Sequence, residues 1–224
     1  DANGARHTVW MDREQIVGNR WTGRHDSRAF IWDRAGGMRD LGPPDSGFRT
    51  AWDINNAGQV IVFAMSGTFL VQLDAQAAIE TCDRLPTMGL ADISNLGRVG
   101  GVIETPMKEY RASIWDPNAG LQHVSEDFFA PGITYMNDRG QLAFSMPRDG
   151  PVELFGRMIL PARHRVYLWD PNRGQVRVDA SVPIGTTEHF GVTDLNNHGC
   201  IVGRVRNERG KSRAVLLEPI PERW

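Results

Sequence analysis

A five-fold internal repeat constrains the fold of this 224-residue chain more than any other feature. In each clear copy an apolar stretch runs into an Asn-x-x-Gly turn or a close variant, and a second apolar stretch follows. The clear copies are TAWDINNAGQV at 50–60, LADISNLGRV at 90–99, ITYMNDRGQL at 133–142 and VTDLNNHGCI at 192–201. A more divergent first copy, HTVWMDREQI, stands at 7–16. A motif that returns at this spacing is typical of solenoids, propellers and repeat arrays.

Each copy continues with further short runs, such as ASIWD at 112–116 and LQHVS at 121–125. The runs are rich in β-branched and aromatic residues and are bounded by turn residues, which indicates strands. Four antiparallel strands in about 40–50 residues is the arrangement of a propeller blade. We therefore predict an all-β chain. It would be a single β-propeller domain over residues 1–224, with five blades of about four antiparallel strands. A segment of a larger propeller and an open β-solenoid are the alternatives.

The repeated turns have a clear physical basis. The Asn55 side chain can bond back to the backbone, and Gly58 can supply the positive φ that closes a short hairpin. Glu14 stands in the glycine position of the first copy, which predicts a strained or altered turn there. The fifth copy lacks a clear fourth strand, so we expect the last blade to be incomplete unless residues 219–224 supply that strand.

Strand alternation divides the connections between two ends of the sheets. Turns after the first and third strands of each copy lie at one end and are repeated, whereas connections after the second and fourth strands lie at the other end and differ in every copy. Variable loops on a rigid scaffold usually carry function, so we place the functional surface there. An insertion at 146–165 accounts for the 59-residue spacing between the last two copies. It would form a cap, an additional hairpin or a partner-docking patch.

Aromatic and histidine side chains on these variable loops are the candidate ligand-binding residues. They are Trp21, His25, Phe48, Tyr110, Phe128, Phe129, His164 and His189. Aromatic rings beside charged groups can stack on sugars or anchor a protein partner, although loop aromatics also pack inward as plugs between blades. The first hypothesis is therefore a non-catalytic propeller that binds a protein, a peptide or a glycan.

The alternative hypothesis is a hydrolase or lyase with its active site at the mouth of the channel. Its candidate catalytic residues are His25, His189, Glu188 and Asp127, because imidazole and carboxylate groups perform general acid–base catalysis. Two carboxylates about 5–9 Å apart would suit glycoside hydrolysis. The same side chains can equally be solvated loop residues. The sequence contains no GxGxxG, GxxxxGK[ST], GxSxG or HExxH motif, so it names no reaction.

Asp53, Asp92 and Asp194 share one repeat position. A ring of carboxylates near the axis can hold a cation, and the structural alternative is that each carboxylate accepts a backbone N–H of the neighbouring blade. No dedicated metal site and no cofactor is expected.

Composition narrows the partners and the location. A net charge of -2 gives no basic footprint for nucleic acid, and no apolar run approaches the roughly 18 residues of a membrane helix. The chain begins at Asp1 with no signal-like segment, so we expect a trimmed chain, and an exported origin is allowed. Cys82 and Cys200 belong to the second and fifth copies, which are not neighbours in a five-membered ring, so no disulfide should join them.

The first copy resembles the HAF repeat family. The residues that carry the resemblance are QIVG at 15–18, AFIWD at 29–33, GMRDLG at 37–42 and AWDIN at 51–55, and the resemblance extends over nearly the whole chain. The family's His before Ala-Phe is replaced here by Arg28, Arg111 and Arg213. Members are bacterial and mostly regarded as exported, so the resemblance implies a repeat fold and a periplasmic or extracellular location. It brings no catalytic motif.

Overall fold

The computed structural model describes residues 9–12, 14–21, 26–43, 45–86, 88–107, 109–126, 134–147, 152–154, 157–159, 164–178, 189–206 and 211–219. Within these ranges every regular element is a strand. The all-β prediction is therefore confirmed for the part of the chain that is described.

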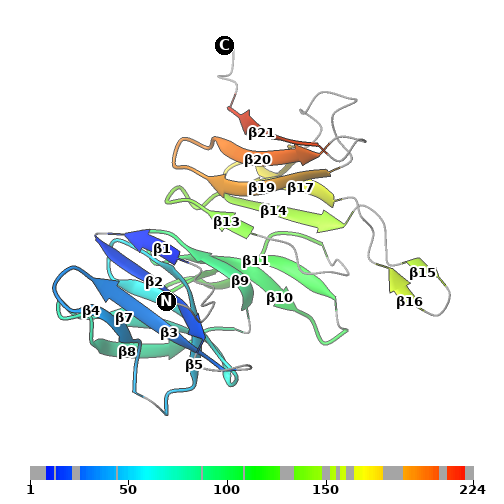
Figure 1. The fold of residues 1–224 in the computed structure, drawn as a ribbon. Helices are drawn as coiled ribbons and strands as arrows, with labels where there is room; N and C mark the ends of the chain where they lie inside the picture. Colours follow the sequence, from blue (N-terminus) through cyan, green and yellow to red (C-terminus); the bar gives the residue numbers. More distant parts are fainter. Residues whose placement is uncertain are drawn as a thin grey trace. The chain divides into compact units, whose positions relative to one another are not determined.

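The strands form five antiparallel sheets, one for each copy of the repeat (Figure 1). The first sheet holds β1 (Val9–Asp12), β2 (Gln15–Trp21), β3 (Ser27–Asp33) and β4 (Gly37–Asp40). The second holds β5 (Phe48–Ile54), β6 (Gln59–Ala64), β7 (Gly67–Leu73) and β8 (Ile79–Arg84). The third holds β9 (Met88–Ile93), β10 (Val99–Glu104), β11 (Tyr110–Asp116) and β12 (Gly120–His123).

The last two sheets differ from this pattern. The fourth sheet holds β13 (Thr134–Met136), β14 (Leu142–Pro147), β17 (His164–Asp170) and β18 (Gly174–Arg177). The fifth holds β19 (His189–Leu195), β20 (Ile201–Arg206) and β21 (Ser212–Leu217). Three strands are thus described in the fifth sheet, as expected for an incomplete last blade, and residues 220–224 lie outside the described ranges.

The chain divides into two compact units, residues 1–97 and 98–224. The first unit contains the first two sheets together with β9, and the second unit contains β10 to β21. The single domain stays a prediction.

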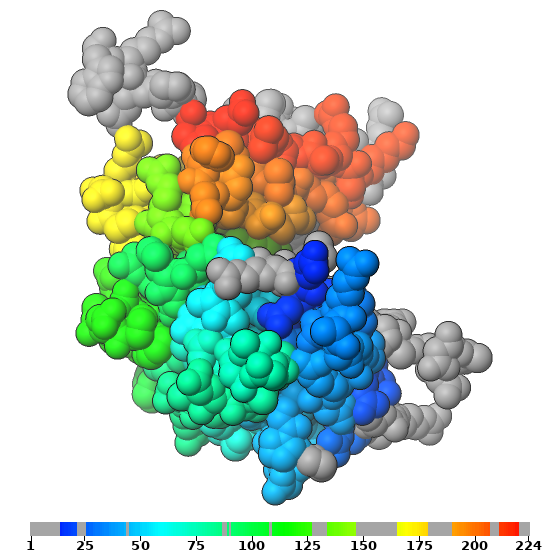
Figure 2. Space-filling view, turned by 90° about the vertical axis from the view of Figure 1, so that its left-hand side faces the viewer, coloured from blue at the N-terminus to red at the C-terminus, as the bar shows by residue number. Residues whose placement is uncertain are grey.

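The core of the first unit lies between its two complete sheets. Val17 and Ile31 of the first sheet pack in one cluster with Val60, Val62 and Val71 of the second, and all five are fully buried. The two sheets lie in direct contact in the space-filling view (Figure 2). Burying a Val or Ile side chain stabilises a fold by about 1.5–3 kcal/mol, so this stacking holds neighbouring repeats together.

In the second unit the central strand β14 is buried on both faces. Leu142 and Phe144 pack against the third sheet, whereas Ala143 belongs to the cluster shared with the fifth sheet. Alternate residues of a strand point to opposite faces, so a strand between two sheets must be apolar throughout. This explains why the repeat is read as continuous apolar runs and not as a strict alternation.

The insertion at 146–165 contributes a small hairpin of its own. Strands β15 (Val152–Leu154) and β16 (Arg157–Ile159) follow β14 and precede β17 in the sequence. They pair antiparallel with each other as a separate two-stranded sheet (Figure 1). Of the three forms predicted for the insertion, the described residues show the hairpin.

The repeated turns have the predicted backbone geometry. Gly58 and Gly140 have φ angles of 75° and 77°, in the left-handed region that favours glycine. Glu14 occupies the same position of the first copy and has a φ of 64°, so a residue with a Cβ adopts the conformation that glycine adopts elsewhere. A left-handed conformation costs an L-residue roughly 1–2 kcal/mol, and the strained turn predicted for the first copy is confirmed.

Candidate functional site

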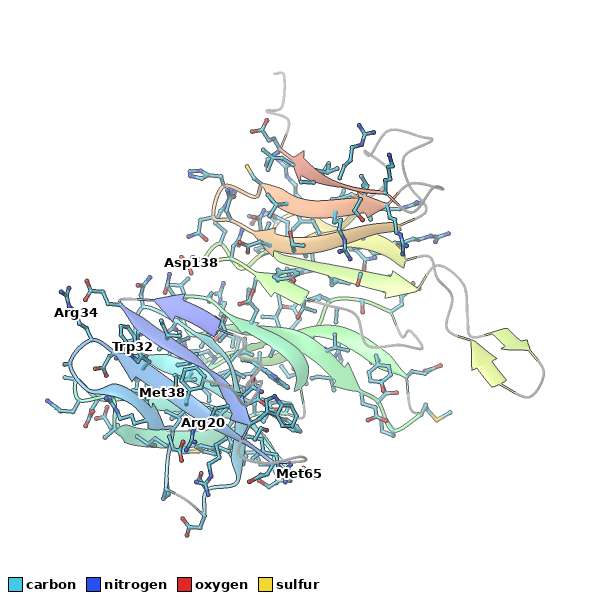
Figure 3. The ribbon with its side chains drawn as sticks, in the orientation of Figure 1. Arg20, Trp32, Arg34, Met38, Met65 and Asp138 are labelled. Carbon is cyan, nitrogen blue, oxygen red and sulfur yellow. The ribbon has the colours of Figure 1, made fainter. Side chains whose placement is uncertain are left out.

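The two ends of each sheet carry different kinds of residue. We call the end with the repeated turns the turn end, and the end with the variable connections the loop end. In the first sheet Arg34 lies at the turn end and Arg20 at the loop end, with Trp32 and Met38 between them (Figure 3). The alternation predicted from the sequence therefore separates two sets of side chains.

At the turn end of the first unit, Asn55 is used entirely for structure. Its Oδ1 accepts the N–H groups of Ala57 and Gln59 at 3.0 and 2.9 Å, which closes its own turn. Its Nδ2 donates to the Gln59 Oε1 at 2.8 Å and to the Ser94 carbonyl at 2.9 Å. Ser94 begins the turn of the next copy, so this amide ties neighbouring repeats together.

The second unit repeats the arrangement. Asn137, which is 4% exposed, donates from Nδ2 to the Gln141 Oε1 at 2.7 Å and to the Asn196 carbonyl at 2.8 Å. The Asp138 N–H donates to the Asn197 Oδ1 at 2.8 Å. Buried polar groups that are fully paired stabilise a fold, so these turns are scaffold.

Carboxylates at the turn end are held ionised by the backbone. The N–H of Asn118, the Arg98 side chain and the N–H of Ala119 lower the pKa of Asp116. For Asp170, burial raises the pKa, but hydrogen bonds from the Gln141 side chain and two backbone N–H groups outweigh it, and the net shift is downward. These groups act as acceptors of hydrogen bonds and are not proton donors near neutral pH.

Asp53, Asp92 and Asp194, which share one repeat position, accept structural hydrogen bonds from backbone N–H groups. The Asp53 Oδ2 accepts the N–H of Ile93 on the neighbouring strand β9 at 2.9 Å, while its Oδ1 accepts the N–H of Ile54 at 2.8 Å. Asp92 and Asp194 accept the N–H of the residue that follows each of them, at 3.0 and 2.8 Å. Within the described residues no group of three or more His, Cys, Asp and Glu side chains is placed to hold a metal ion.

At the loop end of the first sheet, two variable connections converge on a hollow of about 90 Å³. Residues 26–29 line it from the start of β3, residues 40, 41 and 43 from the end of β4, and residues 46–49 from the start of β5. The connections at 19–27 and 42–49, both predicted to belong to the functional surface, therefore meet in space. We call this feature the loop-end hollow.

Two arginine side chains, Arg20 and Arg28, are arranged around Asp40 beside this hollow. Arg20 lies opposite Arg28 in the pairing of β2 with β3. The Arg20 Nε donates to the Asp40 Oδ1 at 2.7 Å, and its Nη2 lies 2.6 Å from the same oxygen. The Arg28 Nη1 lies 3.4 Å from the Asp40 Oδ2, which is a long contact for a charged hydrogen bond.

Phe48, one of the predicted ligand-binding residues, lines the loop-end hollow and is partly buried. Its ring packs against the core of the first unit and lies 5.9 Å from the Phe69 ring, centroid to centroid. The inward-packed alternative therefore applies to most of this side chain. Next to it Arg49 lines the hollow and has no hydrogen bond or ion pair within the described ranges.

Trp21 is the most exposed of the predicted aromatic residues that the structure describes. It ends β2 directly opposite Ser27, which lines the loop-end hollow, and 48% of its surface is exposed. An exposed indole beside a hollow is available to a partner, because aromatic side chains dominate the energy of many interfaces.

The other predicted residues are less informative. Tyr110 is half-buried and packs against the core shared by the third and fourth sheets. The structure describes the backbone at His164 and His189 but not these side chains. The remaining candidates lie outside the described residues; they are His25, Asp127, Phe128, Phe129 and Glu188.

Two further hollows were not predicted. One, of about 340 Å³, lies at the loop end of the third sheet and is lined in part by Glu104, Met107 and His123. The other, of about 520 Å³, lies at the turn end of the first two sheets, beside Glu14 and Arg34. Sequence reasoning missed Arg28 and Arg49 as site residues. Arg28 was noted only as the replacement of the family's His, no motif marks Arg49, and only the meeting of two loops gives them a shared surface.

The thiol of Cys82 is not an activated nucleophile. Cys82 and Cys200 are both free thiols. Burial raises the pKa of the Cys82 thiol, and the neighbouring Asp83 carboxylate raises it further, whereas catalytic cysteines have a lowered pKa. Within the described residues no helix has the length and apolar character needed to cross a membrane.

Comparison with known proteins identifies the architecture. No family model and no curated protein matches the chain. Among solved structures, TolB from Acinetobacter baumannii is similar at 12% identity with a TM-score of 0.57, over 78% of this chain and 43% of TolB. A mutant of puromycin hydrolase complexed with PGG is similar at 12% identity with a TM-score of 0.62, over 96% of this chain and 36% of the hydrolase.

A third similar structure is a propeller domain by its own description. The β-propeller domain of the Trilobed protease from Pyrococcus furiosus, which has an open velcro topology, matches 95% of this chain and 68% of that domain at 11% identity, with a TM-score of 0.61. This chain spans less than half the length of TolB and of puromycin hydrolase. At such low identity the likeness shows the fold alone, and with the five sheets it establishes that this chain is an all-β protein of the β-propeller fold, with five blades.

Proposed function

We propose that this protein is a non-catalytic binding protein that presents the loop end of its sheets to a protein, a peptide or a glycan. The observation that carries the proposal is the loop-end hollow. Two variable connections meet there, an exposed Trp21 stands at the end of the neighbouring strand, and Arg49 lines the hollow without a described partner. Aromatic and arginine side chains are the residues that most often dominate binding energy at interfaces.

The chemistry of the described residues favours binding over catalysis. An enzyme needs acids and bases whose pKa is tuned toward the working pH. The carboxyl groups with lowered pKa, Asp33, Asp116 and Asp170, belong instead to the turn end, where they accept structural hydrogen bonds. The hydrolase or lyase alternative depends on His25, His189, Glu188 and Asp127, whose side chains the structure does not describe, and it has no supporting observation among the described residues.

The exported location implied by the HAF resemblance is part of this proposal. The binding function does not depend on it, since the loop-end hollow is defined by contacts within the first unit alone.

A selection experiment tests the proposal. The immobilised protein is offered a display library of random peptides and, separately, a glycan array, and each ligand obtained is measured against Trp21→Ala. Leu96→Ala is the matched control, because Leu96 is 62% exposed and lies in a repeated turn. We expect ligands that lose at least tenfold in affinity with Trp21→Ala and keep their affinity with Leu96→Ala.

Two results would count against the proposal. In one, neither collection yields a ligand. In the other, every ligand binds both variants as it binds the unmodified protein, so that the loop end takes no part.

A further inference from the structure

We infer that the loop-end hollow recognises a carboxylate group of a peptide ligand. This inference rests on the proposed function and specifies the chemistry of the same site. It is argued from the charges around the hollow and from its size.

The first step concerns Asp40, whose charge is already balanced. The Arg20 guanidinium places two nitrogens within 2.7 Å of the Asp40 Oδ1. Charge-assisted N–H···O contacts are typically about 2.7–2.9 Å, so Arg20 makes a full ion pair with this carboxylate. Arg28 approaches the other oxygen only at 3.4 Å. Arg28 therefore places a second positive charge near the Asp40 carboxylate, whose charge Arg20 already neutralises.

The second step concerns Arg49, which brings another positive charge to the same hollow. It has no hydrogen bond or ion pair with any residue in the described ranges. A guanidinium group carries five N–H donors in a planar fork that matches a carboxylate. Arg28 and Arg49 thus leave donors available on two sides of one small space.

Acidic groups at the hollow do not cancel this surplus. Asp26 lines the hollow, is exposed, and already takes part in an interaction of its own. With Asp26 and Asp40 set against Arg20, Arg28 and Arg49, the local balance is one positive charge. A bound carboxylate would bring it to neutrality.

Size decides between the possible carriers of that carboxylate. The hollow measures about 90 Å³. A water molecule needs about 10–15 Å³ of such a cavity, so the hollow has room for a small group such as a carboxylate with its adjoining methylene. Sites that enclose whole small molecules measure about 300–1,000 Å³. The geometry therefore favours the tip of a peptide, either an Asp or Glu side chain or a C-terminal carboxylate, over an acidic sugar ring.

The test uses peptides of defined ends. Random heptapeptides with a C-terminal amide are selected on the protein, and the best acidic ligand is compared with its Glu-to-Gln copy by fluorescence anisotropy. We expect the Glu peptide to bind about tenfold more tightly, as a charged hydrogen bond predicts. Arg49→Gln should abolish that preference. Arg34→Gln is the matched control, because Arg34 is exposed at the turn end of the first sheet, at the opposite end from the hollow (Figure 3), and it should leave the preference intact.

A second arm separates the two sources of the carboxylate. Peptides without acidic residues are compared with a free and with an amidated C-terminus. Loss of binding on amidation, suppressed by Arg49→Gln, would assign the hollow to a C-terminal carboxylate and would support the inference.

The contradicting outcomes are distinct from failure of the proposed function. If the Glu and Gln peptides bind equally but both lose affinity with Trp21→Ala, the loop end binds ligands and the carboxylate inference is wrong. If a uronic-acid oligosaccharide binds in an Arg49-dependent manner and no peptide does, the peptide assignment is wrong. If no ligand depends on Trp21, the proposed function itself fails.

Discussion

At the turn end of the fourth sheet Asn137 is almost completely buried and its amide makes three hydrogen bonds. At the loop end of the first sheet Arg49 lines a hollow and has no described partner. Both side chains are strongly polar, but only Asn137 has its hydrogen-bonding groups paired within the described part of the protein. The Asn137 amide at the turn end is therefore part of the fold, whereas the Arg49 side chain at the loop end remains available for a ligand.

The turn end also differs between copies. In the second and fourth copies an asparagine links its own turn to the next one through the carbonyls of Ser94 and Asn196. Between the first and second sheets the Arg39 Nη2 instead donates to the Gln76 carbonyl at 3.0 Å, and Glu14 replaces the usual glycine. The repeat therefore tolerates loss of its turn chemistry when another side chain supplies a link between sheets.

The largest change in the free energy of unfolding is expected when a buried hydrogen-bonded side chain at the turn end is removed. Asn137→Ala removes the side-chain amide, so the Asn196 carbonyl, the Gln141 Oε1 and the Gln141 N–H each lose a hydrogen bond. We expect a loss of about 2–4 kcal/mol in the free energy of unfolding, measured by chemical denaturation. Asn197→Ala, at the exposed next position of the following turn, should cost less than about 1 kcal/mol. Equal small losses for the two variants would show that the buried amide is not important for the fold.

A smaller change in the free energy of unfolding, of opposite sign, is expected for a substitution in the turn of the first copy. Glu14→Gly should raise the free energy of unfolding by about 0.5–1 kcal/mol, because glycine adopts a φ of 64° without strain. The reverse change, Gly58→Ala, should lower it by about 1–2 kcal/mol at a φ of 75°. A destabilised Glu14→Gly variant would mean that the Glu14 side chain makes a stabilising contact in solution, against this comparison.

The smallest effect concerns the dependence of stability on pH. The pKa of Asp116 is lowered from its ordinary value of 3.8 by the Asn118 N–H, the Arg98 side chain and the Ala119 N–H. A lowered pKa in the folded state stabilises the fold above pH 3.8, and this contribution is lost as the pH falls through the folded-state pKa. The stability difference between the unmodified protein and Asp116→Asn should therefore shrink below about pH 4.

An Asp116→Asn difference that stays constant from pH 7 to pH 3 would contradict the role assigned to the turn-end carboxylates.

The conformation of the repeated turns could be predicted from the sequence, because the same residue types return at the same positions of each copy. The left-handed glycines, the strain at Glu14 and the bond from Asp53 to the neighbouring strand were all available from the motif, the last as one of two alternatives. The bond from Asn55 to its own turn was also predicted, whereas its bond to the Ser94 carbonyl was not, since nothing in one copy shows how the next copy is placed.

The loop end was predicted only as a region. Trp21 and Phe48 were identified from residue type, and the structure shows that Phe48 also packs inward. Arg28 was noted only as the replacement of the family's His, and Arg49 was not identified at all, because an arginine near a strand end is ordinary until its neighbours are known. Their shared hollow depends on how the connections after β2 and β4 meet, which no local pattern records.

The most direct test of the account measures ligand affinity and thermal stability together in Trp21→Ala and Asn137→Ala, with a ligand selected on the unmodified protein. We predict that Trp21→Ala weakens binding at least tenfold and shifts Tm by less than about 2 °C, since Trp21 is half exposed. Asn137→Ala should lower Tm by about 4–12 °C and leave the affinity of the folded protein unchanged. If Trp21→Ala instead lowers Tm and leaves binding intact, the loop end is structural, and the division between the two ends of the sheets is wrong.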